Sequence, residues 1–130
     1  MTKAYLFLLV QFCLFILLFS TERADAENIV ISTDREVYIA GDRLWLSLRL
    51  INNTGKASDY AYITLSNTSG SRIFNGCLKV NNNRTSGSIY LPDTLTSGMY
   101  RLVSYSNCMR NEGGLFYASK NILVVNRFDV

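Results

Sequence analysis

A leucine stands at every second position between Arg43 and Ile51, and no other feature of the chain constrains its fold as strongly. The leucines occupy positions 44, 46, 48 and 50, whereas Ser47 and Arg49 lie between leucines. Successive side chains of a β-strand point to opposite faces, so this period of two places all four leucines on one face. The segment therefore predicts a strand with one face buried in a core and the other exposed to solvent.

The chain after residue 26 continues as short alternating segments separated by turn residues, and no segment has convincing helical periodicity. Asparagine- and glycine-containing turns are expected at 52–55, 67–71 and 81–83, and Gly76 indicates a bulge or a sheet edge. The predicted strands are Ile29–Thr33, Arg43–Ile51, Tyr60–Ser66, Ile73–Val80, Ser88–Leu91, Met99–Tyr105 and Phe116–Val125. This pattern predicts an all-β fold, a seven-stranded antiparallel sandwich of immunoglobulin or fibronectin type.

The N-terminal segment has the pattern of a secretory signal peptide. Lys3 precedes an apolar run over residues 4–19 that only Gln11 interrupts, and Ala24-Asp25-Ala26 offers the small-x-small pattern of a cleavage site. We expect residues 1–26 to be the signal peptide and residues 27–130 to form one domain. The predicted localisation is exported, in the periplasm, at the cell surface or secreted. The alternative is an uncleaved anchor, although the run is shorter than the ~20 apolar residues that a membrane span needs.

Charge gives no indication of a nucleic-acid partner. The net charge is +3, and the lysines and arginines lie apart in the sequence without runs or aromatic interleaving. We expect no nucleic-acid partner, and contact with the membrane only through the export signal. The expected partner is a protein, or further domains of a longer envelope protein.

The turn before the leucine strand resembles the opening of a macroglobulin-type domain. In the second domain of alpha-2-macroglobulin-like proteins, an acidic residue is followed by a tyrosine, a Gly-polar turn and a strand. Asp34, Tyr38, Gly41 and Asp42 have this order here. The resemblance extends from about Ile29 to Val125 and implies the macroglobulin form of the sandwich, as found near the N-terminus of bacterial envelope proteins.

A second local pattern, Gly98-Met99-Tyr100, follows a turn and enters a late strand. Sandwich domains place a tyrosine corner at such a position, where the hydroxyl binds back to the preceding connection. The resemblance implies the same Gly-x-Tyr entry into a strand. The alternative is that Tyr100 is a core aromatic residue with a solvated hydroxyl.

The residue inventory indicates that the protein is not an enzyme. The sequence contains no histidine, which removes the usual general base and the commonest metal ligand. Asp34 and Asp42 flank turns, where carboxylates accept backbone N–H bonds, and calcium ligation is the alternative. The Gly-Cys-Gly-Glu-Gln motif of thioester-forming macroglobulins is absent, because Leu78 and not Gly follows Gly76-Cys77. We expect no catalytic residues, no metal and no cofactor.

The two cysteines of the predicted domain, Cys77 and Cys108, are candidates for a disulfide in an oxidising compartment. Two buried thiols are the alternative. Trp45 and Tyr62 alternate against the apolar faces of their strands, so they are candidates for outward contact residues. Cross-strand aromatic packing is the alternative for these rings.

The sequence as a whole predicts a non-catalytic structural or binding module of an exported cell-envelope protein. Two alternatives stay open at this point. One is a part of an alpha-2-macroglobulin-like endopeptidase inhibitor, and the other is a small secreted adhesive or carbohydrate-binding sandwich.

Overall fold

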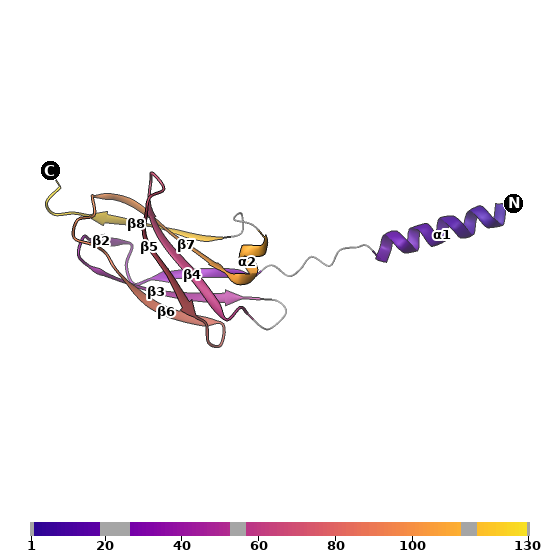
Figure 1. Cartoon of the computed structure of the whole chain (residues 1–130), viewed down its shortest axis with the longest axis horizontal. Helices are drawn as coiled ribbons and strands as arrows, with labels where there is room; N and C mark the ends of the chain where they lie inside the picture. The colour runs from indigo at the N-terminus through magenta and orange to yellow at the C-terminus, as the bar shows by residue number, and fades with distance from the viewer. Residues whose placement is uncertain (1, 19–26, 53–56, 113–116, 130) are drawn as a thin grey trace.

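A computed structural model describes residues 2–18, 27–52, 57–112 and 117–129. Strands of this part of the chain form two sheets that face each other (Figure 1). The strands are β1 (Asn28–Thr33), β2 (Val37–Ile39), β3 (Arg43–Ile51), β4 (Tyr60–Asn67), β5 (Arg72–Lys79), β6 (Arg84–Tyr90), β7 (Gly98–Ser106) and β8 (Ala118–Val125). The helices are α1 (Thr2–Leu18) and α2 (Asn107–Glu112).

One sheet has three strands in the order β1-β3-β6, and the other has five in the order β2-β8-β7-β4-β5. Neighbouring strands run antiparallel except β2 and β8, which pair in parallel. The predicted all-β sandwich is confirmed, but the prediction of seven antiparallel strands is wrong, because the described residues form eight strands with one parallel pair.

The additional strand, β2, has only three residues and follows directly on the polar turn after β1. A segment this short has no measurable period. Its pairing partner is β8, the last described strand in chain order, which lies more than 80 residues later in the chain. Helix α2 was also not predicted, since it is a short segment directly after β7. Pairing with β8 and not local pattern determines β2.

The core lies between the two sheets and is formed by the alternate residues that the leucine pattern predicts. β3 has a strictly alternating burial pattern, with Leu44, Leu46, Leu48 and Leu50 buried. Buried residues of β4, β7 and β8 come from the opposite sheet, among them Ile63, Leu65, Leu102, Ile122 and Val124. Each fully buried aliphatic side chain of this kind contributes about 1.5 to 3 kcal/mol through the hydrophobic effect.

Gly76 lies in β5, at the edge of the five-stranded sheet, as one of the two predicted alternatives requires. The irregularity in pairing occurs between Leu65 and Ser66, and Gly76 itself pairs regularly with Ile63. A Cβ atom on Gly76 would lie 2.8 Å from ring atoms of Phe74. Glycine at this position therefore makes room for the Phe74 ring.

Helix α1 lies apart from the sandwich in Figure 1, and most of its apolar side chains are exposed. The predicted cleavage pattern at residues 24–26 falls outside the described residues. Among the residues that are described, no helix has the length and apolar character needed to cross a membrane.

Candidate functional site

Four residues of the predicted macroglobulin motif region form one hydrogen-bonded unit, which we call the Asp34 clasp: Asp34, Arg35, Tyr38 and Asp42. Tyr38 is fully buried, and its hydroxyl donates to Asp34 Oδ1 at 2.6 Å and accepts from the Arg35 N–H at 3.0 Å. Asp34 Oδ1 also accepts from the backbone N–H of Trp45 at 3.1 Å. The Asp34 carboxylate thus connects the end of β1, the short strand β2 and the first part of β3.

The other half of the clasp closes the turn before β3. Arg35 Nη1 lies 3.2 Å from Asp42 Oδ2, and its guanidinium carbon lies 4.9 Å from the ring centroid of Tyr38. Asp42 Oδ2 also accepts from the backbone N–H of Ile39 at 3.0 Å. Gly41 has φ +97°, a conformation that favours glycine. These contacts are those of a structural turn. Asp34 Oδ1 and Asp42 Oδ2 accept hydrogen bonds from the protein itself, as expected for carboxylates at a turn.

Hydrogen bonding and burial shift the pKa values of Asp34 and Tyr38 in opposite directions. The Tyr38 hydroxyl is the main cause that holds the pKa of Asp34 below its usual value of 3.8, against the opposing effect of desolvation. Burial is the main cause that raises the pKa of Tyr38 above 10.0, and its bond to Asp34 adds to the rise. The clasp is therefore built for an ionised Asp34 and a neutral Tyr38.

We predict that the Asp34 clasp makes the domain sensitive to acid. A lowered pKa in the folded state gives a stabilising contribution that is present above the unfolded pKa and is lost as the pH falls through the folded pKa. The free energy of unfolding should therefore decrease as the pH drops below about 3.8. The Asp34→Asn variant should be less stable than the unchanged chain at neutral pH, and its stability should depend less on pH in acid. Urea unfolding between pH 2 and 6 measures this, with Asp59→Asn as control. An equal pH slope in Asp34→Asn and the unchanged chain would contradict the assignment.

The hydrogen bond expected of a tyrosine corner is present at the start of β7. Tyr100 is buried, and its hydroxyl donates to the backbone carbonyl of Thr96 at 2.7 Å. Gly98 opens the strand between these two residues. The bond holds the connection before β7 against the core.

We predict that Tyr100→Phe lowers the free energy of unfolding by about 0.5 to 1.5 kcal/mol, because the partly buried hydrogen bond to the Thr96 carbonyl is lost. Thermal or urea unfolding measures the loss. Tyr60→Phe is the matched control, since Tyr60 is exposed on the same sheet. A loss no larger than that of the control would show that the hydroxyl contributes nothing to the fold.

The predicted disulfide between Cys77 and Cys108 is not formed in the structure, in which both residues are thiols. Cys77 lies on β5 opposite Tyr62 of β4, whereas Cys108 lies in α2 after β7. β4 separates β5 from β7. The two cysteines therefore lie on elements that are not neighbours in the sheet.

The two candidate contact aromatics lie on the outer faces of different sheets. Trp45 is 57% exposed on the three-stranded sheet. Tyr62 is half-buried and stacks on Tyr105 at 5.2 Å between centroids, and Tyr105 stacks on Tyr117 at 4.5 Å. The Arg110 guanidinium lies 5.7 Å from the Tyr62 ring centroid. Because other rings and a cation cover the faces of this column, Trp45 is the better placed of the two for contact with a partner.

Glu27, the first residue of the predicted mature domain, is fully buried. Its carboxylate accepts from the Ser58 N–H and the Ser58 hydroxyl, each at 2.7 Å, and from the Ser106 hydroxyl. Sequence analysis missed this buried acid, because its partners lie 31 and 79 residues away in the chain. The contacts anchor the start of β1 to the five-stranded sheet.

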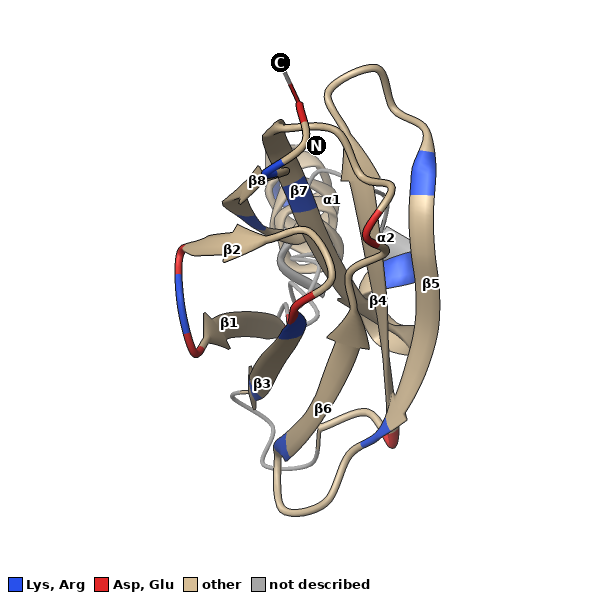
Figure 2. Cartoon of the chain, turned by 90° about the vertical axis from the view of Figure 1, so that its left-hand side faces the viewer, with Lys and Arg blue, Asp and Glu red and all other residues tan. Residues whose placement is uncertain are grey.

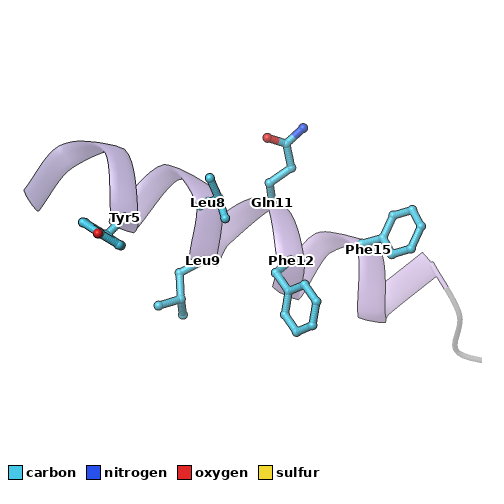
Figure 3. A pocket seen from close by; sticks show the side chains of 6 residues that line it. All are labelled: Tyr5, Leu8, Leu9, Gln11, Phe12 and Phe15. Carbon is cyan, nitrogen blue, oxygen red and sulfur yellow. The ribbon is translucent and has the colours of Figure 1, made fainter. Parts of the chain in front are cut away.

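The hollow along α1 is not a candidate site. About 450 Å³ in volume, it is lined by side chains of that single helix, which point in several directions around the axis (Figure 3). A single helix provides only one side of a binding pocket, so the hollow is a gap between exposed side chains. The described residues also hold no group of three or more histidine, cysteine or acidic side chains placed to bind a metal ion.

An exposed apolar patch lies on the outer face of the five-stranded sheet, and we call it the β2–β8 patch. Its members are Val37, Ile39, Met99, Leu123 and Val125, which are between 36% and 52% exposed. They are neighbours by strand register, because Leu123 lies between Val37 and Met99, and Val125 lies beside Ile39. The patch could not be predicted from the sequence, since it depends on the pairing of the unpredicted strand β2.

The chain matches no protein-family profile, and no curated protein is significantly similar to it. Among solved structures it is similar to Escherichia coli alpha-2-macroglobulin activated by porcine elastase, with a TM-score of 0.63 and 15% identity over 76% of this chain. A Salmonella alpha-2-macroglobulin mutant gives a TM-score of 0.65 and 12% identity over 85% of this chain. The CARDB domain of a Pyrococcus furiosus protein gives 0.50 and 13%, over 82% of this chain and 98% of that one.

These similarities define the class of fold. The chain is a β-sandwich with a macroglobulin-like fold, and it matches only 8% and 7% of the two alpha-2-macroglobulin chains. The likeness therefore concerns one module of a much longer protein.

Proposed function

We propose that the chain is a non-catalytic structural and binding module of an exported cell-envelope protein, and that it docks on a protein surface. That surface belongs to a further domain of the same envelope protein or to a separate protein. Two observations support the module reading: the macroglobulin-like fold, and the small share of the bacterial alpha-2-macroglobulins that it matches. The lack of histidine in the sequence supports the non-catalytic reading.

The observation that carries the proposal is the β2–β8 patch. Its five members are aliphatic or methionine side chains on three neighbouring strands. Covering such a surface contributes about 25 cal/mol per Å² of apolar area removed from water. A protein partner supplies apolar area of this kind.

Site-specific photo-crosslinking tests this docking. A photoreactive amino acid at Leu123 should give one discrete protein adduct in cells of the source organism, whereas the same group at Asn75 should give none. Asn75 is the matched control, because it is exposed on the edge strand β5 of the same sheet. Leu123 giving no adduct, or both positions giving the same adducts, would contradict the proposal.

Export is the second part of the proposal. The apolar segment of α1 after Lys3 and the small-x-small pattern at residues 24–26 support a cleaved signal peptide. Cleavage before Glu27 leaves the buried carboxylate contacts intact, because they are made by the Glu27 side chain with Ser58 and Ser106. The mature domain therefore keeps the anchor of its first strand.

Endopeptidase inhibition is a second candidate, which the likeness to a protease-activated alpha-2-macroglobulin favours. Covalent trapping requires the thioester motif that this sequence lacks. If the second candidate function is right, the chain acts as one part of an inhibitory assembly and does not trap a protease covalently. Elastase activity on a protein substrate, measured with and without the full chain, tests whether the chain inhibits on its own.

A further inference from the structure

The outer face of the three-stranded sheet has an unusual composition. The outward positions of its strands carry three arginines, four serines, one tryptophan and one tyrosine, and no aspartate or glutamate. We call this surface the serine–arginine face. Its members are Asn28, Val30, Ser32, Arg43, Trp45, Ser47, Arg49, Ile51, Arg84, Ser86, Ser88 and Tyr90. Asp34, directly after β1, is an acid that borders these positions, and it lines a hollow with Trp45 at the end of the sheet away from Arg49 and Arg84. Figure 2 shows basic residues on both β3 and β6.

Strand register places hydroxyls and positive charges beside each other on this face. Ser47 lies between Ser32 of β1 and Ser86 of β6, which gives a row of three hydroxyls across the sheet. Arg49 of β3 lies directly opposite Arg84 of β6, next to this row. All five residues line one hollow of about 580 Å³.

The arginine pair has no acidic partner among the described residues, whose ion pairs both belong to Arg35. Like charges directly opposite each other in a sheet repel and destabilise it. An anion between Arg49 and Arg84 removes this repulsion and accepts charge-assisted hydrogen bonds from both guanidinium groups. The hollow therefore combines the donors that an anionic group needs with hydroxyls that exchange hydrogen bonds with a polar ligand.

Trp45 extends the surface along β3. Its side chain is 57% exposed, and it lies on the same face as Ser47 and Arg49. Arg49 lies four positions after Trp45 on the same strand, a distance of about 13 Å. A ligand that contacts both the indole and the arginine pair must be extended and must carry apolar, hydroxyl and anionic groups.

We propose that the serine–arginine face binds an acidic polysaccharide. A carboxylate or sulfate group binds Arg49 and Arg84, sugar hydroxyls bind the serine row, and a sugar ring packs on the Trp45 indole. This proposal rests on the proposed function, because it assigns a ligand class to the binding module. The polysaccharide binds the three-stranded sheet, whereas the β2–β8 patch lies on the five-stranded sheet. A nucleic acid fits less well, because the face has three arginines and the whole chain has a net charge of only +3. An acidic protein offers carboxylates without the hydroxyls that would match the serine row.

The intrinsic fluorescence of the full chain tests the proposal, because Trp45 is its sole tryptophan. Dextran sulfate and polygalacturonate should each give a saturable change in Trp45 emission at low salt, and neutral dextran should give none. Polyglutamate and single-stranded DNA should bind at least tenfold more weakly than the acidic polysaccharides. Equal binding of dextran, polyglutamate or single-stranded DNA, or no response to either acidic polysaccharide, would overturn the proposal.

Two matched variants locate the binding. Arg49→Gln together with Arg84→Gln should weaken polysaccharide binding by about tenfold or more, since two charge-assisted contacts are lost. Arg101→Gln is the control, because Arg101 is exposed on the other sheet. Equal weakening by both changes would overturn the assignment. Urea unfolding checks that the variants fold, and the single change Arg84→Gln replaces the double variant if that one does not. Crosslinking from Leu123 is independent of these arginines, so it separates failure of this inference from failure of the proposed function.

Discussion

Replacing Tyr38 with alanine is expected to lower the free energy of unfolding by about 3 to 5 kcal/mol, the range observed when a buried aromatic side chain is removed from a core. The Tyr38 ring is fully buried, and its hydroxyl is bonded to Asp34 and to the backbone N–H of Arg35. The change therefore leaves a cavity beside β2 and also removes a partner of the Asp34 carboxylate. Urea unfolding followed by circular dichroism measures the loss.

Tyr38→Phe separates the two contributions, because it keeps the ring and removes only the hydroxyl. We expect this variant to lose about 1.5 to 3 kcal/mol, the contribution of a hydrogen bond to a charged group, because the hydroxyl no longer donates to Asp34. If Tyr38→Ala lost no more than Tyr38→Phe, the ring would contribute nothing, and the placement of Tyr38 in the core would be wrong.

Replacing Glu27 with alanine is expected to lower the free energy of unfolding by about 3 kcal/mol, because three hydrogen bonds are lost at a net contribution of about 1 kcal/mol each. The change removes the acceptor for the Ser58 N–H, the Ser58 hydroxyl and the Ser106 hydroxyl. The start of β1 then loses its anchor to the five-stranded sheet.

Glu36→Ala is the matched control for Glu27→Ala, because the Glu36 side chain is exposed in the turn before β2. Its loss should stay within about 0.5 kcal/mol, as is usual for surface positions. Equal stability of the two variants would show that the buried carboxylate does not hold the domain together.

Much of the fold could be predicted from the sequence because its main strands carry a period of two. The leucines of β3 alternate with polar residues, and the structure buries all four of them. β2 and the first half of β6 could not be predicted in this way. β2 has three residues, and residues 84–88 of β6 carry no large apolar side chain, so their pairing to β8 and β3 decides their conformation.

The candidate site shows the same limit. The order of Asp34, Tyr38 and Asp42 in the sequence indicated a turn, but the carboxylate bond to the Trp45 backbone depends on how β1 and β3 pair. Alternation along β3 indicated that Trp45 points outward, and its exposure agrees with this. The arginine pair across β3 and β6 was not visible in the sequence, because its two members are 35 positions apart.

The two sheets offer surfaces of different chemistry. The β2–β8 patch is aliphatic and lies on the five-stranded sheet, whereas the serine–arginine face is polar and basic and lies on the three-stranded sheet. The two proposals therefore concern different sheets: protein docking is proposed for the β2–β8 patch, and binding of an acidic polysaccharide is proposed for the serine–arginine face.

The measurement that tests the account most directly is the N-terminal residue of the chain recovered from the cell envelope. Edman sequencing or intact mass should show a chain that begins at Glu27, in the periplasmic, surface or secreted fraction. A chain that keeps Met1 and is recovered from the cytoplasm would contradict the proposed export, and with it the function as an envelope module.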